Sequence, residues 1–129
     1  MDNTIVAVLM IVMGVAISGV WTREILAGEK IDLTHGIFAA RDPDAGTLFW
    51  PHWLAEYTTA AALIGGAIGL FLEASWATTL SGLATGALLY TSTNSLAWAL
   101  SQRGRLAYAI PMFSGIAVGL FIAIYFVVP

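Results

Sequence analysis

Two long apolar segments decide the fold: residues 53–72, WLAEYTTAAALIGGAIGLFL, and residues 76–100, WATTLSGLATGALLYTSTNSLAWAL, joined only by Glu73-Ala74-Ser75. A helix that crosses a bilayer needs about 20 predominantly apolar residues, and both segments reach that length. Their apolar residues follow one another instead of alternating with polar ones, which favours helices over the strands of a membrane β-barrel. A link this short makes neighbouring helices run in opposite directions.

The flanking segments have the same character. Residues 4–21 and residues 106–128 are also apolar, and no positively charged stretch of the kind found in a signal peptide precedes the first of them, so we expect it to be retained as a span. The 129-residue chain is 59% hydrophobic and only 10% charged, whereas soluble domains have about 25% charged residues. We therefore predict an all-α, single-domain integral membrane protein, an antiparallel four-helix bundle.

The charges predict how the chain is oriented. All five basic residues lie in the first and third predicted loops: Arg23, Lys30, Arg41, Arg103 and Arg105. The positive-inside rule places those loops in the cytoplasm and both termini outside, and we predict a prokaryotic inner membrane. The net charge of −3 offers no basic stripe for nucleic acid.

The first loop, residues 22–52, is the unusual part of the chain. Connections beyond about 15 residues are uncommon in compact domains unless they are functional or disordered. This one contains too many large apolar side chains for disorder: Ile25, Leu26, Ile31, Leu33, Ile37, Phe38, Leu48, Phe49 and Trp50. We expect a structured cap on the cytoplasmic end of the helices.

Each predicted helix also carries a pair of small residues four positions apart. Such pairs let helix backbones approach closely where lipid provides no hydrophobic drive for association. The pairs are Gly14 and Ser18, Gly65 and Gly69, Gly82 and Gly86, and Gly115 and Gly119. They predict tight packing, either within the chain or between copies in a homo-oligomer.

Polar residues gather in the cytoplasmic half of the predicted helices. Glu56 is the only ionisable residue clearly inside a span, where such residues are costly and often functional. His52 precedes it by four residues, so the two share a helical face, which Thr59 continues. In the third span, one stripe with i, i+3, i+4 and i+7 spacing consists of Thr91, Asn94, Ser95 and Trp98. We expect Glu56, His52 and Asn94 to share one buried chamber.

This pattern favours a ligand pocket, because such pockets combine apolar walls with a few polar groups. We expect His52 and Glu56 to bind the polar head of a lipid-like or quinone-like molecule, or of a docked partner subunit. The remaining polar contacts would come from Thr59, Thr91, Asn94 and Ser95, and the walls from Trp53, Trp98 and Tyr108. No cysteine and no paired His-x-x-x-His motif is present, and we predict no metal site.

Three alternatives stay open. Glu56 can simply stabilise the positive end of its helix dipole, with the aromatic residues as an interfacial belt and Asn94 joining two helices. Glu56 can instead carry protons in a small-solute transporter that works as an oligomer. Finally, Glu56 and His52 can act as the acid–base pair of a membrane enzyme.

The chain also resembles the DoxX-like family of small four-helix membrane proteins. The resemblance covers about residues 54–100 and rests on Leu54-Ala55-Glu56, Gly65-Gly66, Gly69-Leu70 and Trp76-Ala77. It implies that Glu56 corresponds to the acidic residue in the second span of that family. Because members include a membrane subunit of a thiosulfate:quinone oxidoreductase, the resemblance implies an accessory subunit of a redox complex. The segment Gly46-Thr-Leu-Phe-Trp-Pro-His-Trp53 departs from the family pattern.

Overall fold

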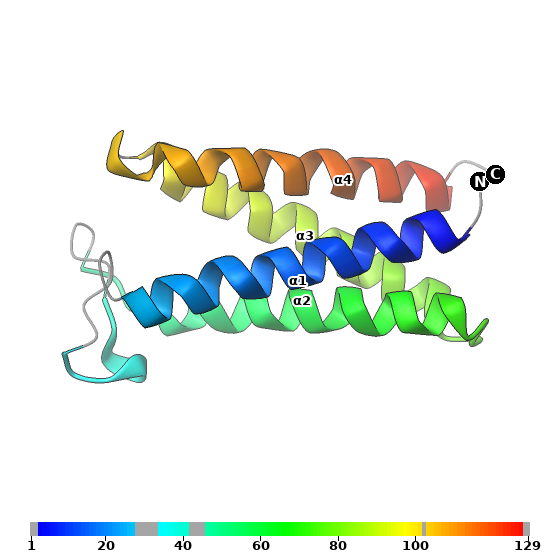
Figure 1. Ribbon diagram of the computed structural model, residues 1–129, viewed down its shortest axis with the longest axis horizontal. Helices are drawn as coiled ribbons and strands as arrows, with labels where there is room; N and C mark the ends of the chain where they lie inside the picture. Colours follow the sequence, from blue (N-terminus) through cyan, green and yellow to red (C-terminus); the bar gives the residue numbers. More distant parts are fainter. Residues whose placement is uncertain (1–2, 28–33, 42–45, 102, 128–129) are drawn as a thin grey trace.

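The computed structural model describes residues 3–27, 34–41, 46–101 and 103–127, and the described residues are almost entirely helical (Figure 1). The all-α prediction is confirmed. Four α-helices and two short 3-10 helices are present among them: α1 (Asn3–Ala27), η1 (Ile37–Ala39), α2 (Trp50–Phe71), α3 (Ala77–Leu100), η2 (Arg103–Tyr108) and α4 (Ala109–Val127).

The boundaries of α1 and α2 differ from the predicted ones at the end where the first loop lies. α1 continues six residues beyond Trp21, to Ala27, and α2 begins at Trp50 instead of Trp53. Pro51 occupies the first turn of α2, where a missing N–H costs nothing because that group has no partner inside the helix. The first loop is therefore shorter than residues 22–52, and part of it, residues 28–33 and 42–45, lies outside the described residues.

The described part of this loop folds back on α2. Arg41 and Leu48 form an antiparallel bridge, and the Phe49 N–H donates to the Ala40 carbonyl oxygen at 2.9 Å. Both Ala40 and Phe49 are buried. These contacts fix Phe49 directly before the first turn of α2, which sets the surroundings of His52.

Each α-helix packs along the one that precedes it in the chain, whereas α1 and α4 touch only sparsely. In Figure 1, α1 and α2 lie side by side, and the first turn of α1 and the last turn of α4 are at the same end of the molecule. There the Tyr125 hydroxyl donates to Asn3 Oδ1 at 2.7 Å. At the opposite end, the Tyr108 hydroxyl donates to the Glu24 carboxylate.

Several of the small residues allow close helix contacts within the chain. A methyl group at Gly14 would lie 2.9 Å from the Ala60 carbonyl oxygen, so α1 and α2 are in backbone contact there. Gly115 and Gly119 of α4 instead pack closely on the side chains of Ser92 and Leu89 of α3. A methyl group at Gly82 or Gly86, by contrast, would meet no atom of the described residues within 4 Å, so this pair mediates no close helix contact among them.

Three helices in the described residues are long and apolar enough to cross a membrane: Asn3–Ala27, Trp50–Phe71 and Arg103–Val127. The helix predicted over residues 76–100 forms as α3, but it is not among them. Its interior face explains the difference, because its buried residues include Ser81, Thr85, Thr91, Ser92 and Ser95. That residues 76–100 cross the membrane as a fourth span therefore stays a prediction.

Candidate functional site

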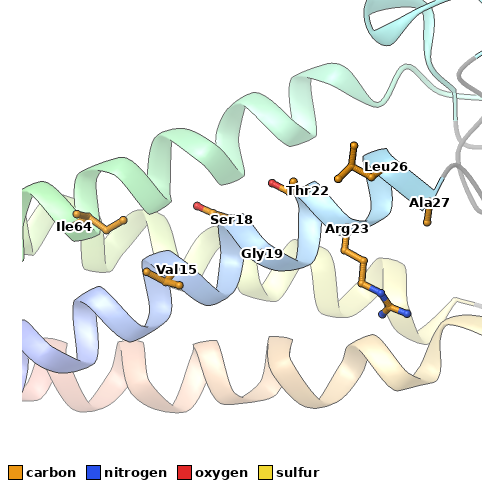
Figure 2. Close-up of a pocket in the computed structure, with 8 residues that line it drawn as sticks. All are labelled: Val15, Ser18, Gly19, Thr22, Arg23, Leu26, Ala27 and Ile64. Carbon is orange, nitrogen blue, oxygen red and sulfur yellow. The ribbon is translucent and has the colours of Figure 1, made fainter.

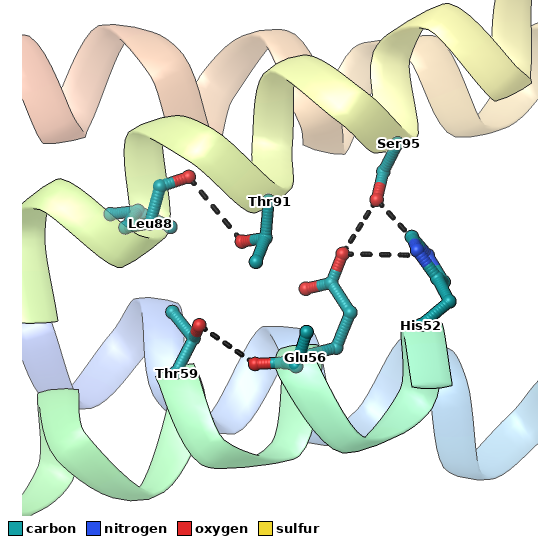
Figure 3. A network of polar contacts seen from close by, with 7 residues as sticks. His52, Glu56, Thr59, Leu88, Thr91 and Ser95 are labelled. Carbon is teal, nitrogen blue, oxygen red and sulfur yellow. Dashed lines mark hydrogen bonds and ion pairs between the residues drawn. The ribbon is translucent and has the colours of Figure 1, made fainter. Parts of the chain in front are cut away.

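The centre of the candidate site is a group of three side chains, His52, Glu56 and Ser95, which we call the buried polar cluster (Figure 3). The Ser95 hydroxyl donates to Glu56 Oε1 at 2.5 Å, and its oxygen lies 3.2 Å from His52 Nε2. His52 Nε2 is 3.6 Å from Glu56 Oε1, too far for a hydrogen bond. Ser95 therefore connects the carboxylate and the imidazole.

Helix geometry explains how these residues meet. His52 and Glu56 are four residues apart on α2, so they project from one face. The face continues through buried Thr59 and Leu63, which pack toward α3. Ser95 belongs to the matching buried face of α3 together with Thr91 and Ala99. Glu56 is only 2% exposed, so its carboxylate is enclosed on every side by protein.

Thr59 and Thr91 lie in the same buried layer, but their hydroxyls bond within their own helices. The Thr59 hydroxyl donates to the Ala55 carbonyl at 2.8 Å, and the Thr91 hydroxyl lies 3.5 Å from the Leu88 carbonyl. Figure 3 marks both of these contacts with dashed lines. Their predicted role in binding a ligand stays a prediction.

The structure corrects the predicted position of Asn94. We expected its amide in a chamber with Glu56 and His52, but Asn94 is exposed. Successive residues of an α-helix point about 100° apart, so α3 cannot turn both Ser95 and Asn94 toward Glu56. Instead, Asn94 lines a cavity outside the buried polar cluster, where it meets His52.

Aromatic side chains surround the imidazole, and we call Trp21, Phe49, Trp53 and Trp98 the aromatic shell. Trp21 meets His52 edge-on with ring centroids 4.7 Å apart, and Phe49 meets it at 5.2 Å. Trp98 lies 5.9 Å from both Trp21 and Phe49. Trp53 packs on Phe49 at 5.3 Å. The indole N–H groups of Trp21 and Trp53 are buried and have no hydrogen-bond partner among the described residues.

An open cavity of about 300 Å³, the mouth cavity, leads to His52. Three polar side chains, Thr47, His52 and Asn94, line it beside the aromatic rings of Phe49 and Trp98. Its complete lining is Thr47, Leu48, Phe49, His52, Asn94, Ala97 and Trp98. Glu56 does not line this cavity, but Ser95 connects it to His52, which does.

A second buried carboxylate lies on the other side of the aromatic shell. Glu24 of α1 is 4% exposed and accepts a hydrogen bond from Tyr108, whose ring packs on Trp98 at 5.7 Å. The Arg105 guanidinium is also buried and lies 4.5 Å from the centre of the Trp98 ring, a cation–π contact. Tyr108, predicted as a pocket wall, does not line the mouth cavity.

Sequence reasoning missed Glu24, Arg105, Trp21 and Phe49 as parts of this site. For Glu24 a signal existed. The buried residues Ile17, Trp21 and Glu24 follow one another at spacings of four and three, so the buried face of the first helix continues past Trp21, where the predicted span ends. The exposed Arg23, on the opposite face of the helix, instead suggested that the helix ends before Glu24.

Within the described ranges, no three His, Cys, Asp or Glu side chains come together as a metal site would require. Comparison with known proteins yields no assignment: no family model matches the chain, and neither a curated protein nor a solved structure matches it. The chemistry of the site therefore has to be inferred from its geometry. That geometry consists of a buried carboxylate joined by one hydroxyl to an imidazole at the base of an aromatic-walled cavity.

Proposed function

We propose that this chain is an integral membrane protein that binds the head group of a quinone-like molecule in the mouth cavity. The observation that carries the proposal is the pairing of two polar side chains, His52 and Asn94, with the aromatic rings of Phe49 and Trp98 in one cavity. Ligand sites typically join apolar and aromatic walls to a few polar groups that fix orientation. A flat ring with oxygen substituents suits such a site.

The buried polar cluster favours a quinone-like ligand over an ordinary lipid. When Glu56 is ionised, Ser95 donates to it, and the Ser95 oxygen can then accept from His52 Nε2. When Glu56 carries a proton, the same three groups can form the chain in the reverse direction, with Ser95 donating to His52. The nitrogen Nδ1 then changes from acceptor to donor, which matches an oxygen that alternates between hydroxyl and carbonyl.

Thermal unfolding of the detergent-solubilised protein with a short-chain quinone tests this proposal. A ligand that binds only the folded state raises Tm. We expect a rise for the unaltered chain and a much smaller one for Glu56→Gln and for Asn94→Ala. Glu73→Gln, which alters an exposed carboxylate between α2 and α3, is the matched control. Equal rises for Glu56→Gln and the unaltered chain would remove Glu56 from the site.

The membrane arrangement is part of the same proposal: α1 to α4 cross a prokaryotic inner membrane as an antiparallel bundle with both termini outside. Three helices of sufficient length and apolarity support it, as does α3, which has no charged residue over its 24 residues. Because the chain has no cysteine, single substitutions report topology cleanly. An impermeant maleimide should label Ser75→Cys in intact cells and Ser101→Cys only after permeabilisation.

The role we propose is that of an accessory subunit that holds the quinone-like molecule for a redox partner. The resemblance to DoxX-like proteins supports this role. Gly82 and Gly86 are exposed, and an added methyl group there would meet no atom of the described residues within 4 Å, so they leave a face of α3 for that partner or for a second copy. Purification in mild detergent, followed by identification of co-purified proteins, tests it. The transporter and acid–base enzyme hypotheses remain predictions from the sequence.

A further inference from the structure

A shallow apolar groove runs along the outer side of α1, and we call it the α1 groove (Figure 2). Its volume is about 850 Å³, and it is lined by Val15, Ser18, Gly19, Thr22, Arg23, Leu26, Ala27 and Ile64. From Val15 to Ala27 the helix rises about 18 Å. The groove shares no residue with the mouth cavity, so the two are separate sites.

The polar side chains of the groove, apart from Arg23, already have partners. The Ser18 hydroxyl donates to the Gly14 carbonyl at 2.9 Å, and the Thr22 hydroxyl bonds the Tyr57 hydroxyl of α2 at 2.8 Å. What remains for a ligand along most of the groove is hydrocarbon surface. Gly19 deepens its middle, because a side chain there would meet no atom within 4 Å.

Arg23 is the exception. Its guanidinium is exposed and has no hydrogen bond, ion pair or ring contact within the described residues. Figure 2 shows it extending from α1 on the side opposite Leu26 and toward α4. There it also lines a second cavity of about 300 Å³, formed with Val20, Ala107, Tyr108 and Pro111. The neighbouring carboxylate, Glu24, is buried and bonded to Tyr108.

We infer that this surface binds an anionic phospholipid, with the phosphate at Arg23 and an acyl chain in the α1 groove. Arginine matches phosphate with a planar fork of donors, and basic residues at the cytoplasmic side of membrane helices attract anionic head groups. A hydrocarbon groove that starts at an unpaired cation has the charge and polarity pattern of such a lipid. The inference rests on the proposed membrane insertion, but not on quinone binding.

Native mass spectrometry of the detergent-solubilised protein, after incubation with equal amounts of phosphatidylglycerol and phosphatidylcholine, tests the head-group contact. We expect the unaltered chain to retain phosphatidylglycerol preferentially. Arg23→Gln should lower that retention about fivefold, the effect of one basic residue near an anionic surface. Arg103→Gln removes the same charge from an exposed position in η2 and should leave retention unchanged. Equal losses in the two variants would overturn the inference.

A second pair of variants tests the acyl-chain contact. Gly19→Leu adds a bulky side chain to the α1 groove, and Gly82→Leu adds the same side chain to α3; at both positions the added Cβ meets no atom within 4 Å. We expect the first to reduce phosphatidylglycerol retention several-fold and the second to have no effect. Retention unchanged by Gly19→Leu would overturn the groove as the binding site. Displacement of the lipid by glycerol phosphate alone would show a head-group anion site without an acyl chain, and would overturn it as well.

Discussion

Ser95 on α3 donates its hydroxyl hydrogen to the buried carboxylate of Glu56 on α2 at 2.5 Å. This single contact joins two helices and also links Glu56 to His52, because the same oxygen lies 3.2 Å from the imidazole. Hydrogen bonds to charged groups are stronger than neutral ones, and a buried acceptor left without its donor is costly. The first prediction follows from this relationship.

Ser95→Ala should destabilise the fold by about 1–3 kcal/mol, because the Glu56 carboxylate loses its donor while it stays buried. Thr93→Ala is the control, since the exposed Thr93 hydroxyl donates only to the Leu89 carbonyl of its own helix. Unfolding in detergent followed by circular dichroism measures both. If the two variants lose the same stability, Ser95 contributes nothing through Glu56.

Tyr108→Phe should destabilise the fold by about 1–3 kcal/mol for the same reason, since Glu24 is buried and accepts from the Tyr108 hydroxyl. Tyr90→Phe removes a hydroxyl from a side chain that is 71% exposed and should be nearly neutral. The free energy of unfolding, measured for both variants, tests this prediction. A neutral Tyr108→Phe would mean that Glu24 does not depend on this donor.

Gly14→Ala should destabilise the α1–α2 contact by about 1–3 kcal/mol, because the added methyl group would lie 2.9 Å from the Ala60 carbonyl oxygen, and a backbone atom cannot move away cheaply. Gly86→Ala adds the same group where nothing lies within 4 Å. It should be neutral or stabilising by up to about 1 kcal/mol, as alanine is the better helix former. The Tm should therefore fall for Gly14→Ala and stay unchanged or rise for Gly86→Ala. An equal fall in both variants would contradict a specific backbone contact at Gly14.

Glu73→Gly should stabilise the turn between α2 and α3 by about 1 kcal/mol. Glu73 has a φ of 52°, a left-handed conformation that costs a side-chain-bearing residue about 1–2 kcal/mol and glycine nearly nothing. The Glu73 N–H donates to the Leu70 carbonyl, a bond that glycine retains. A lower Tm for Glu73→Gly than for the exposed-site control Ser75→Gly would contradict this explanation.

The sequence allowed prediction of the helices because their apolar runs are long and their connections short. α3 shows the limit: its polar residues Thr91, Asn94 and Ser95 are predicted to form one stripe, but only the structure shows which of them turn inward. Ser95 and Thr91 do, whereas Asn94 does not. The pairing of Glu56 with His52 was predictable from their spacing of four. The sequence does not show that Ser95 is the third residue of the buried polar cluster. Which polar residue of α3 faces Glu56 depends on the rotation of α3 about its own axis.

The ends of the helices limited the rest of the prediction. Arg23 suggested that α1 stops near Trp21, which placed Glu24 in a loop and removed it from consideration. Arg105 was counted only as a topology signal, although it is buried beside Trp98. Both errors arise because the sequence does not show which way a charged side chain faces. Arg23 is exposed on a helix that continues past it, whereas Glu24 and Arg105 are buried.

The sparse contact between α1 and α4 has a mechanical consequence. α4 is attached to the rest of the protein chiefly through α3 and η2. Three of the four helix pairs, α1–α2, α2–α3 and α3–α4, are packed extensively, whereas the α1–α4 pair is not. When the chain is pulled from its C-terminus, α4 should detach as a separate first step, while α1 and α2 stay packed against each other. Under lateral pressure, α1 and α4 should be the first pair of neighbouring helices to separate.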